Sequence, residues 1–281
     1  MEVITSRDEF RKATSDVRAG GSRLGLVPTM GAFHEGHISL LRAAASSCDV
    51  VAVSIFVNPL QFSSASDLAQ YPADLDKDIS MAQAVGVGLL FAPSAQEMYP
   101  RGEPETRVEP GPLADRLEGA SRPGHFTGVA TVVTKLLSLS GRCRAFFGEK
   151  DFQQLALVRR LVADLDLDVE IVGCPTVRES DGLACSSRNR RLGPDERSAA
   201  TVLFKALEAG RDALSTGARQ SAEVEATMVG VVAAERRAEL DYAVVVDPVT
   251  LGSPASLSGE LRLLIAARVG PVRLIDNLGV K

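Results

Sequence analysis

The chain has 281 residues, of which 24% are charged, and its net charge is −5. This length suits one large domain or two smaller ones. The acidic balance offers no positive field to attract nucleic acid or an anionic membrane, so neither is expected as a partner. Four scattered cysteines without a C-x-x-C pair, a polar start (MEVITSRDEF) and the absence of an apolar run of about 20 residues predict a reduced, cytoplasmic protein.

The first elements form a strand–helix–strand pattern. An S-x-x-E capping box beginning at Ser6 predicts a helix from about Arg7 to Arg18. An apolar run at 24–27 predicts a short buried strand, followed by a turn and a helix that starts near His37. The β-branched run from Val50 to Val57 is typical of a buried parallel strand. These elements predict a βαβ unit.

The remaining elements predict a parallel sheet followed by a second, smaller α+β domain. Residues 68–84 predict a loop and a helix whose aspartates, Asp74, Asp76 and Asp78, form a solvated face. Residues 93–123 predict a long excursion of the kind that often covers a site. The other predicted strands cover residues 87–92, 144–147, 169–172, 242–247, 261–269 and 272–277. The other predicted helices cover 129–139, the segment from the polar residues after Gly148 to about 165, 194–214 and 221–237.

The stretch from Leu24 to His37, LGLVPTMGAFHEGH, carries the strongest chemical signal. Its glycines, Gly31 and Gly36, allow close approach of a ligand to the backbone, and a helix N-terminus there favours phosphate. His34 and His37 can donate hydrogen bonds to charged oxygens. Two plainer interpretations stay open: core or surface histidines, or a metal-ligand pair that lacks a third ligand.

Neutral amides follow the next strand at Asn58 and Gln61, and they suit a hydroxylated or carboxylated small molecule better than phosphate. An ordinary Asn-Pro turn is the alternative. After residues 144–147, Gly148 permits close approach, Lys150 offers a point charge for phosphate, and Gln154 projects from the first helical turns. A capped, exposed helix start is the plainer interpretation there.

A compact group of phosphate donors follows at Ser186, Ser187 and Arg188, on a loop that can move. In isolation, these three residues would be weak evidence for a phosphate site. Here they follow two other segments that suit a nucleotide. The sequence therefore suggests a nucleotide site whose residues come from several segments.

Four motifs occur in order: P-T-M-G-x-x-H-x-G-H, V-S-I-F-V-N-P-x-Q-F, F-G-E-K-D-x-Q-Q and R-E-x-D-G-L-x-x-S-S-R-N. The first resembles the signature of the HIGH superfamily of nucleotidyltransferases and class I aminoacyl-tRNA synthetases. Together, over nearly the whole chain, the four closely resemble the pantothenate synthetases, or pantoate–β-alanine ligases. The resemblance implies an α/β fold, with a Rossmann-like, doubly wound parallel sheet at residues 1–176 and a smaller α+β domain at 177–281 that brings the Ser-Ser-Arg loop over ATP.

The resemblance also implies roles for individual residues. His37 is implied as proton donor, with His34, Lys150 and Arg188 as further catalytic residues, and Gln61, Gln154 and Asn58 as substrate-binding residues. Arg122 and His125 match motif positions without a defined role. Phe33 stands where the family has Leu, and Cys185 where it has Met. The implied ATP-binding residues are Met30, Gly31, Ala32, Phe33, His34, Glu35, Gly36, His37, Gly148, Glu149, Lys150, Asp151, Val177, Cys185, Ser186, Ser187 and Arg188.

The implied reaction joins pantoate to β-alanine with ATP, through a pantoyl-adenylate. Mg²⁺ is expected to accompany ATP, held by phosphates and water rather than by a dedicated protein site. A cytoplasmic homodimer that acts on small molecules is expected. Two other functions remain open: a nucleotidyltransferase acting on a phosphorylated cofactor precursor, and a metallohydrolase using His34, His37 and His125.

Overall fold

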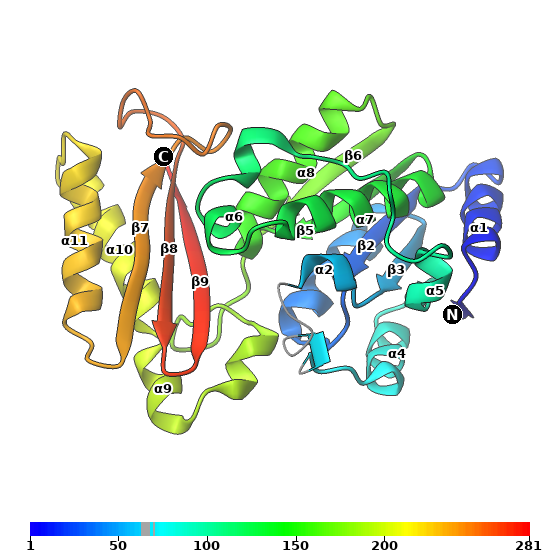
Figure 1. Ribbon diagram of the computed structural model, residues 1–281, viewed down its shortest axis with the longest axis horizontal. Helices are drawn as coiled ribbons and strands as arrows, with labels where there is room; N and C mark the ends of the chain where they lie inside the picture. Colours follow the sequence, from blue (N-terminus) through cyan, green and yellow to red (C-terminus); the bar gives the residue numbers. More distant parts are fainter. Residues whose placement is uncertain (63–67, 70) are drawn as a thin grey trace. The chain divides into compact units, whose positions relative to one another are not determined.

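The computed structural model describes residues 1–62, 68–69 and 71–281. These residues form two compact units, drawn in Figure 1. The first comprises Met1–Gly148 and Gln153–Pro175, and the second comprises Glu149–Phe152 and Thr176–Lys281. The short segment 149–152 therefore groups with the C-terminal unit, although it lies within the N-terminal part of the sequence.

The first unit contains a six-stranded parallel sheet in the order β1-β4-β3-β2-β5-β6. This arrangement confirms the predicted Rossmann-like fold. The edge strand β1, which pairs with β4, was not predicted. The strands of this sheet are β1 (Glu2–Ile4), β2 (Leu24–Thr29), β3 (Val50–Ile55), β4 (Leu89–Phe91), β5 (Cys143–Gly148) and β6 (Val169–Cys174).

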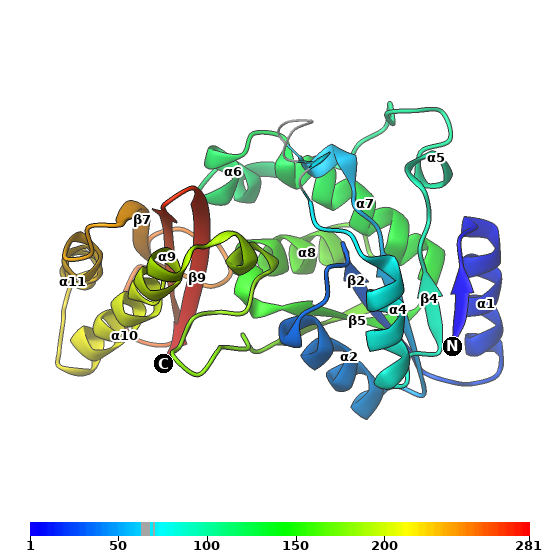
Figure 2. The same ribbon diagram turned by 90° about the horizontal axis from the view of Figure 1, so that it is seen from below.

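Helices cover both faces of this sheet, with α2 and α4 on one face and α1, α7 and α8 on the other (Figure 2). Phe10 on α1 stacks on Phe91 of β4, and Leu41 on α2 is fully buried. The bounds of these helices are α1 (Arg7–Ala19), α2 (Glu35–Ser47), α4 (Leu75–Ala84), α7 (His125–Ser140) and α8 (Phe152–Asp164). Shorter helical segments are η1 (Pro59–Gln61), α5 (Ala95–Met98), η2 (Gly111–Ala114) and α6 (Glu118–Ser121).

Predicted and observed helices differ in several places. The helix predicted directly after Gly148 begins at Phe152, and the one predicted over 194–214 is two helices, Pro194–Ala199 and Val202–Ser215. Ser6 caps α1 as predicted, because its hydroxyl accepts the Glu9 N–H. α2 begins at Glu35 with His34 as N-cap, two residues before the predicted start. α7 begins at His125 rather than at Val129. Of the predicted loop and helix at 68–84, residue 70 lies outside the described residues, and the helix is α4.

The strand order reverses between β2 and β5. The crossover from β2 leads outward to β3 and that from β5 leads outward to β6, so their carboxyl ends flank the switch point of the sheet. Ligands of doubly wound sheets bind at this point. The turn after β2 and the end of β5 at Gly148 are therefore the places where the fold favours a ligand.

The second unit is a three-stranded antiparallel sheet, β7-β8-β9, packed against helices. Its core contains Leu207 of α10, Met228 of α11 and Leu263 of β8, all fully buried. This confirms the predicted α+β class of the C-terminal part. Its elements are η3 (Glu149–Asp151), η4 (Ser187–Arg191), α9 (Pro194–Ala199), α10 (Val202–Ser215), α11 (Ser221–Ala233), β7 (Ala238–Val246), β8 (Leu261–Val269) and β9 (Val272–Val280).

Within the described ranges, no helix combines the length and the apolar character needed to cross a membrane.

Candidate active site

The turn after β2 has a backbone that ordinary residues rarely adopt. Gly31 and Ala32 both have positive φ angles, of 81° and 55°. The Thr29 hydroxyl accepts the Gly31 N–H at 3.1 Å. A Cβ on Gly31 would lie 2.7 Å from a carboxylate oxygen of Asp78, so glycine is required there for both conformation and space.

Asp78 on α4 holds the backbone of this turn. Its two carboxylate oxygens accept the N–H groups of Ala32 and Phe33, each at 2.8 Å. The predicted solvated face is therefore wrong for this residue, which is only 2% exposed, although Asp74 and Asp76 are exposed. A helical charge pattern alone does not reveal it, because its partners lie 45 and 46 residues earlier in the sequence.

Replacing Asp78 with asparagine is expected to destabilise the first unit. An amide has one acceptor oxygen, so one buried N–H of the turn would face an NH₂ group, at a cost of about 1–3 kcal/mol in unfolding free energy. Denaturant unfolding of Asp78→Asn against wild type measures this loss. Asp76→Asn, on the exposed side of α4, is the matched control and should change the free energy by under about 0.5 kcal/mol. Equal stability of the two variants would contradict the role of Asp78.

The two histidines of the turn cap α2. Nδ1 of His34 accepts the Gly36 N–H at 3.1 Å, and Nδ1 of His37 accepts the His34 N–H at 3.4 Å. Since an accepting ring nitrogen carries no proton, this network assigns the proton of each neutral ring to Nε2. The ring centroids lie 4.2 Å apart. The arrangement gives two neighbouring N–H donors at a helix N-terminus, which suits an anionic ligand.

Asn58 and Gln61, at the end of β3 and in η1, belong to one buried network. The Asn58 amide donates to Gln61 Oε1 at 3.2 Å and to the Gly128 carbonyl at 3.1 Å. Its oxygen accepts the Tyr99 hydroxyl at 2.8 Å. Burial raises the pKa of Tyr99 above its ordinary value, so this hydroxyl stays neutral and can donate. Asn58 is 1% exposed and orients Gln61, whose amide reaches the sulfur of Met30 at 2.8 Å.

His125 and Arg122 fix the backbone of the same segment. Nδ1 of His125 lies 2.8 Å from the Gln61 carbonyl, and Arg122 donates to that carbonyl at 3.1 Å. Nε2 of His125 lies 3.1 Å from Arg122. Both ring nitrogens of His125 thus contact protein groups, whereas a metal ligand would need one of them. The part of the chain that the structure describes contains no group of three or more potential metal ligands. The metallohydrolase hypothesis has no support from this geometry.

Two adjacent glutamines at the start of α8 have different environments. Gln153 is 5% exposed. It accepts the Glu118 N–H and donates to the carbonyls of Leu113 and Arg116, so it anchors the long connection at residues 93–123 to α8. Gln154, the residue predicted to bind substrate, is half-buried in the first turn of the helix. The motif F-G-E-K-D-x-Q-Q thus contains one glutamine that fixes the structure and one that is a candidate ligand.

In the second unit, Lys150, Ser186 and Arg188 line one narrow cavity. The Lys150 side chain is 18% exposed, and its Nζ lies 3.6 Å from Asp151. The Ser186 hydroxyl accepts the Arg188 N–H and caps η4. A short hairpin precedes them, in which Cys185 N–H donates to the Val177 carbonyl at 2.9 Å. Three of the predicted ATP-binding residues of this unit therefore come together from two distant segments.

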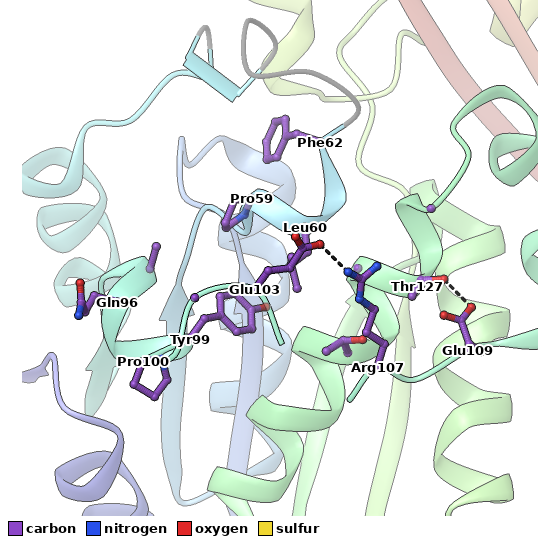
Figure 3. A pocket seen from close by; sticks show the side chains of 15 residues that line it. Pro59, Leu60, Phe62, Gln96, Tyr99, Pro100, Glu103, Arg107, Glu109 and Thr127 are labelled. Atoms are coloured by element: carbon purple, nitrogen blue, oxygen red, sulfur yellow. Dashed lines mark hydrogen bonds and ion pairs between the residues drawn. The ribbon is translucent and has the colours of Figure 1, made fainter. Parts of the chain in front are cut away.

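A different, larger cavity lies in the first unit (Figure 3). Its volume is about 730 Å³, and Tyr99, Glu103, Arg107 and Thr127 are among its lining residues. None of the described residues that line it is among those predicted to bind ATP or a substrate. Cavity size therefore does not identify the residues predicted to bind ATP or a substrate.

The doubly wound sheet, with its glycine turn and helix-capping histidines, defines an α/β protein of the nucleotide-binding class. The family model described as pantoate-beta-alanine ligase matches residues 2–279. The chain belongs to this family, and it is an ATP-dependent ligase.

Similar proteins span the whole chain. The pantothenate synthetases of Mycolicibacterium smegmatis and Heliobacterium modesticaldum are 51% and 47% identical over 281 residues, covering all of this chain and 88% and 100% of theirs. A crystal structure of pantothenate synthetase from Thermus thermophilus has a TM-score of 0.91 and 45% identity, covering 99% of both chains. The Francisella tularensis pantoate-beta-alanine ligase, complexed with beta-gamma ATP and beta-alanine, has a TM-score of 0.81 and 36% identity, covering 99% of this chain and 97% of that one.

Proposed function

We propose that this protein condenses (R)-pantoate with β-alanine to give pantothenate, AMP and pyrophosphate, through a pantoyl-adenylate. The observation that carries this proposal is the pair of α2-capping histidines, whose bonding assigns an N–H to Nε2 of each ring. Family membership supplies the substrate class. The complex of the F. tularensis relative with beta-gamma ATP and beta-alanine supports the same substrates here.

The first step needs charge stabilisation rather than a protein nucleophile. The oxide that a carboxylate would have to expel is a poor leaving group, so the pantoate carboxylate attacks the α-phosphorus and pyrophosphate departs. Donors that strengthen their bonds as charge develops on the phosphates lower this barrier. We assign this role to His34, His37, Lys150 and Arg188, with His37 as the proton donor. The amine of β-alanine then attacks the acyl carbon, and AMP leaves.

Residues of both units are proposed to bind the substrates. Gln61 and Gln154 present amides to pantoate, and Asn58 supports that site by orienting Gln61. This assignment treats residues 1–176 as the ATP- and pantoate-binding domain and 177–281 as the domain that brings its Ser-Ser-Arg loop to ATP. The proposed ATP-binding residues are Met30, Gly31, Ala32, Phe33, His34, Glu35, Gly36, His37, Gly148, Glu149, Lys150, Asp151, Val177, Cys185, Ser186, Ser187 and Arg188.

Mg²⁺ is proposed to enter with ATP, bound mainly by phosphates and water. The buried carboxylate beneath the turn, that of Asp78, already accepts a backbone N–H on each oxygen. Bound to the triphosphate, the ion neutralises part of its charge. A cytoplasmic homodimer is also proposed, from the family resemblance. Sedimentation of the purified protein at several concentrations tests the dimer, and a monomer at every concentration would exclude it.

Pyrophosphate exchange tests the proposed function directly. Labelled pyrophosphate should enter ATP only when pantoate is present, and β-alanine should not be required. Exchange that proceeds without pantoate, or that needs a phosphorylated cofactor precursor in its place, would instead favour the nucleotidyltransferase alternative.

The exchange of Cys185 for methionine is expected to be nearly neutral. Cys185 is half-buried, and in the proposed site only an apolar contact with the nucleotide is needed from it. Apolar exchanges of this kind cost under about 1.5 kcal/mol. Steady-state kinetics of Cys185→Met should therefore match wild type. A dead variant, together with inactivation of the native enzyme by a thiol reagent in the presence of ATP, would make Cys185 a nucleophile instead.

A further inference from the structure

Two neighbouring residues of β9, Asp276 and Asn277, are polar and buried, with only 4% and 3% of their surfaces exposed. Buried polar groups of this kind are retained where they are fully hydrogen-bonded. Successive residues of a strand point to opposite sides. β9 can therefore contact two different segments at this one point.

Asn277 holds the segment that carries Lys150. Its amide nitrogen donates to the Glu149 carbonyl at 2.9 Å and to the Lys150 carbonyl at 2.8 Å. Both hydrogens of the amide are thus used on two consecutive carbonyls of η3. Asn277 thus holds the backbone that carries the Lys150 side chain at two points.

Arg262 on β8 braces the same amide. Its Nε donates to the Asn277 oxygen at 2.7 Å, and its Nη2 donates to the Glu149 carboxylate at 3.0 Å. The guanidinium carbon lies 4.1 Å from the ring centre of Phe152. With its oxygen held by Arg262, the Asn277 amide cannot turn to present an acceptor to η3.

Asp276 holds the other segment through Arg178. The two form a bidentate ion pair, with distances of 2.6 and 2.9 Å between guanidinium nitrogens and carboxylate oxygens. Arg178 also donates to the Gly182 carbonyl at 3.0 Å, across the turn of the hairpin that it begins. Its guanidinium carbon lies 3.9 Å from the ring centre of Phe204. A bidentate pair of this kind fixes orientation as well as position.

The hairpin leads directly into the Ser-Ser-Arg segment. Arg178 is bridged to Ala184, and the next residues are Cys185 and Ser186. Asp276 lines the same narrow cavity as Lys150, Ser186 and Arg188. Two adjacent residues of one strand thus hold the two sequence-distant segments whose side chains meet in that cavity.

We infer that Asp276 and Asn277 are positioning residues that place Lys150 and the Ser186–Arg188 segment for the triphosphate of ATP. The inference rests on the proposed function. A phosphate site works only when its donors are held near the productive geometry. Residues that are hydrogen-bonded to the donor segments keep the donors in that geometry. Neither residue touches the substrate in this assignment, and each acts through the segment to which it is bonded.

Asn277→Asp is the principal test, because it keeps the shape and the acceptor for Arg262 while replacing the amide nitrogen, which carries both donor hydrogens, with one carboxylate oxygen that faces the two carbonyls. The dissociation constant of MgATP, measured by calorimetry without pantoate, should rise about 10-fold or more, comparable with the roughly 10–100-fold effect of outer partners in metal sites. The KM for β-alanine should stay within about twofold. Asp276→Asn should likewise raise the dissociation constant of MgATP and leave the KM for β-alanine nearly unchanged. Glu239→Gln, at an exposed position of β7, is the control and should behave as wild type.

A double variant separates positioning from general damage. In a Lys150→Met background, Asn277→Asp should weaken MgATP binding by less than about threefold, because its effect passes through Lys150 and the two changes are not additive. Additive effects, or equal changes in the constants for ATP and β-alanine, would overturn the inference, as would unchanged ATP binding in both single variants. Absence of pantoate-dependent pyrophosphate exchange in wild type would instead overturn the proposed function.

Discussion

Replacing His34 or His37 with alanine is expected to lower the rate of adenylate formation by about 10²–10³, the usual cost of losing one donor to developing charge. Both rings stand at the N-terminus of α2, and the hydrogen bonds that their Nδ1 atoms accept assign an N–H to Nε2 of each. Single-turnover formation of AMP-linked pantoate measures this step apart from product release. Near-normal rates in both variants would remove the turn after β2 from the chemistry.

The capping role of His34 requires a control, because an alanine there also removes the acceptor for the Gly36 N–H. Such losses cost about 1 kcal/mol of helix stability. Asparagine is a good N-cap, so His34→Asn keeps the cap but cannot place an N–H where Nε2 stands. We expect His34→Asn to be as stable as wild type and as slow as His34→Ala. Recovery of the rate in His34→Asn would show that His34 only caps α2.

Lys150→Met is expected to have an effect of similar size. The substitution keeps an unbranched apolar stem and removes the charge from the cavity that Lys150 shares with Ser186 and Arg188. Removing one donor aimed at the triphosphate should lower kcat/KM for ATP by about 10²–10³. Steady-state kinetics with pantoate and β-alanine saturating measure this loss.

Two further substitutions separate the position of the charge from its presence. Lys205→Met, at an exposed site of α10, removes the same charge elsewhere in the second unit and should leave the kinetics unchanged. Lys150→Arg keeps the charge but replaces a point donor with a planar fork, so it should recover only part of the activity. Full activity of Lys150→Met would contradict the assignment of Lys150 to the phosphates.

The sequence predicts best the features that local patterns encode. Apolar runs located β2, β3 and β5, and the capping box at Ser6 located α1. β1 was missed because it has only three residues and is defined by pairing with β4, which lies more than 80 residues away. Propensity and periodicity contain no information about such a distant partner.

The same distinction applies to the site. Motif residues such as His34 and Lys150 can be found from their type and their place after a strand. The acidic pattern around Asp78 predicts a solvated face, whereas its carboxylate accepts the N–H groups of Ala32 and Phe33. Residues that support a site by bonding to its backbone carry no local sequence signature, because the tertiary fold determines which groups they contact.

The Asn58 amide shows what a motif position does not reveal about a side chain. Its position after β3 marked it as a polar residue at the carboxyl edge of the sheet. In the structure its donors and acceptor are bonded to Gln61, Gly128 and Tyr99. The sequence motif predicts where the side chain lies, but only the structure shows which of its atoms already form hydrogen bonds within the protein.

Oxygen labelling shows whether the pantoate carboxylate attacks the α-phosphorus of ATP, as we propose. With ¹⁸O in the pantoate carboxylate, one labelled oxygen should appear in AMP after complete turnover with β-alanine. In the absence of β-alanine, a bound adenylate should accumulate, because a site that excludes water protects it. Label in inorganic phosphate, with ADP as the nucleotide product, would mean attack on the γ-phosphorus and would contradict the adenylate mechanism.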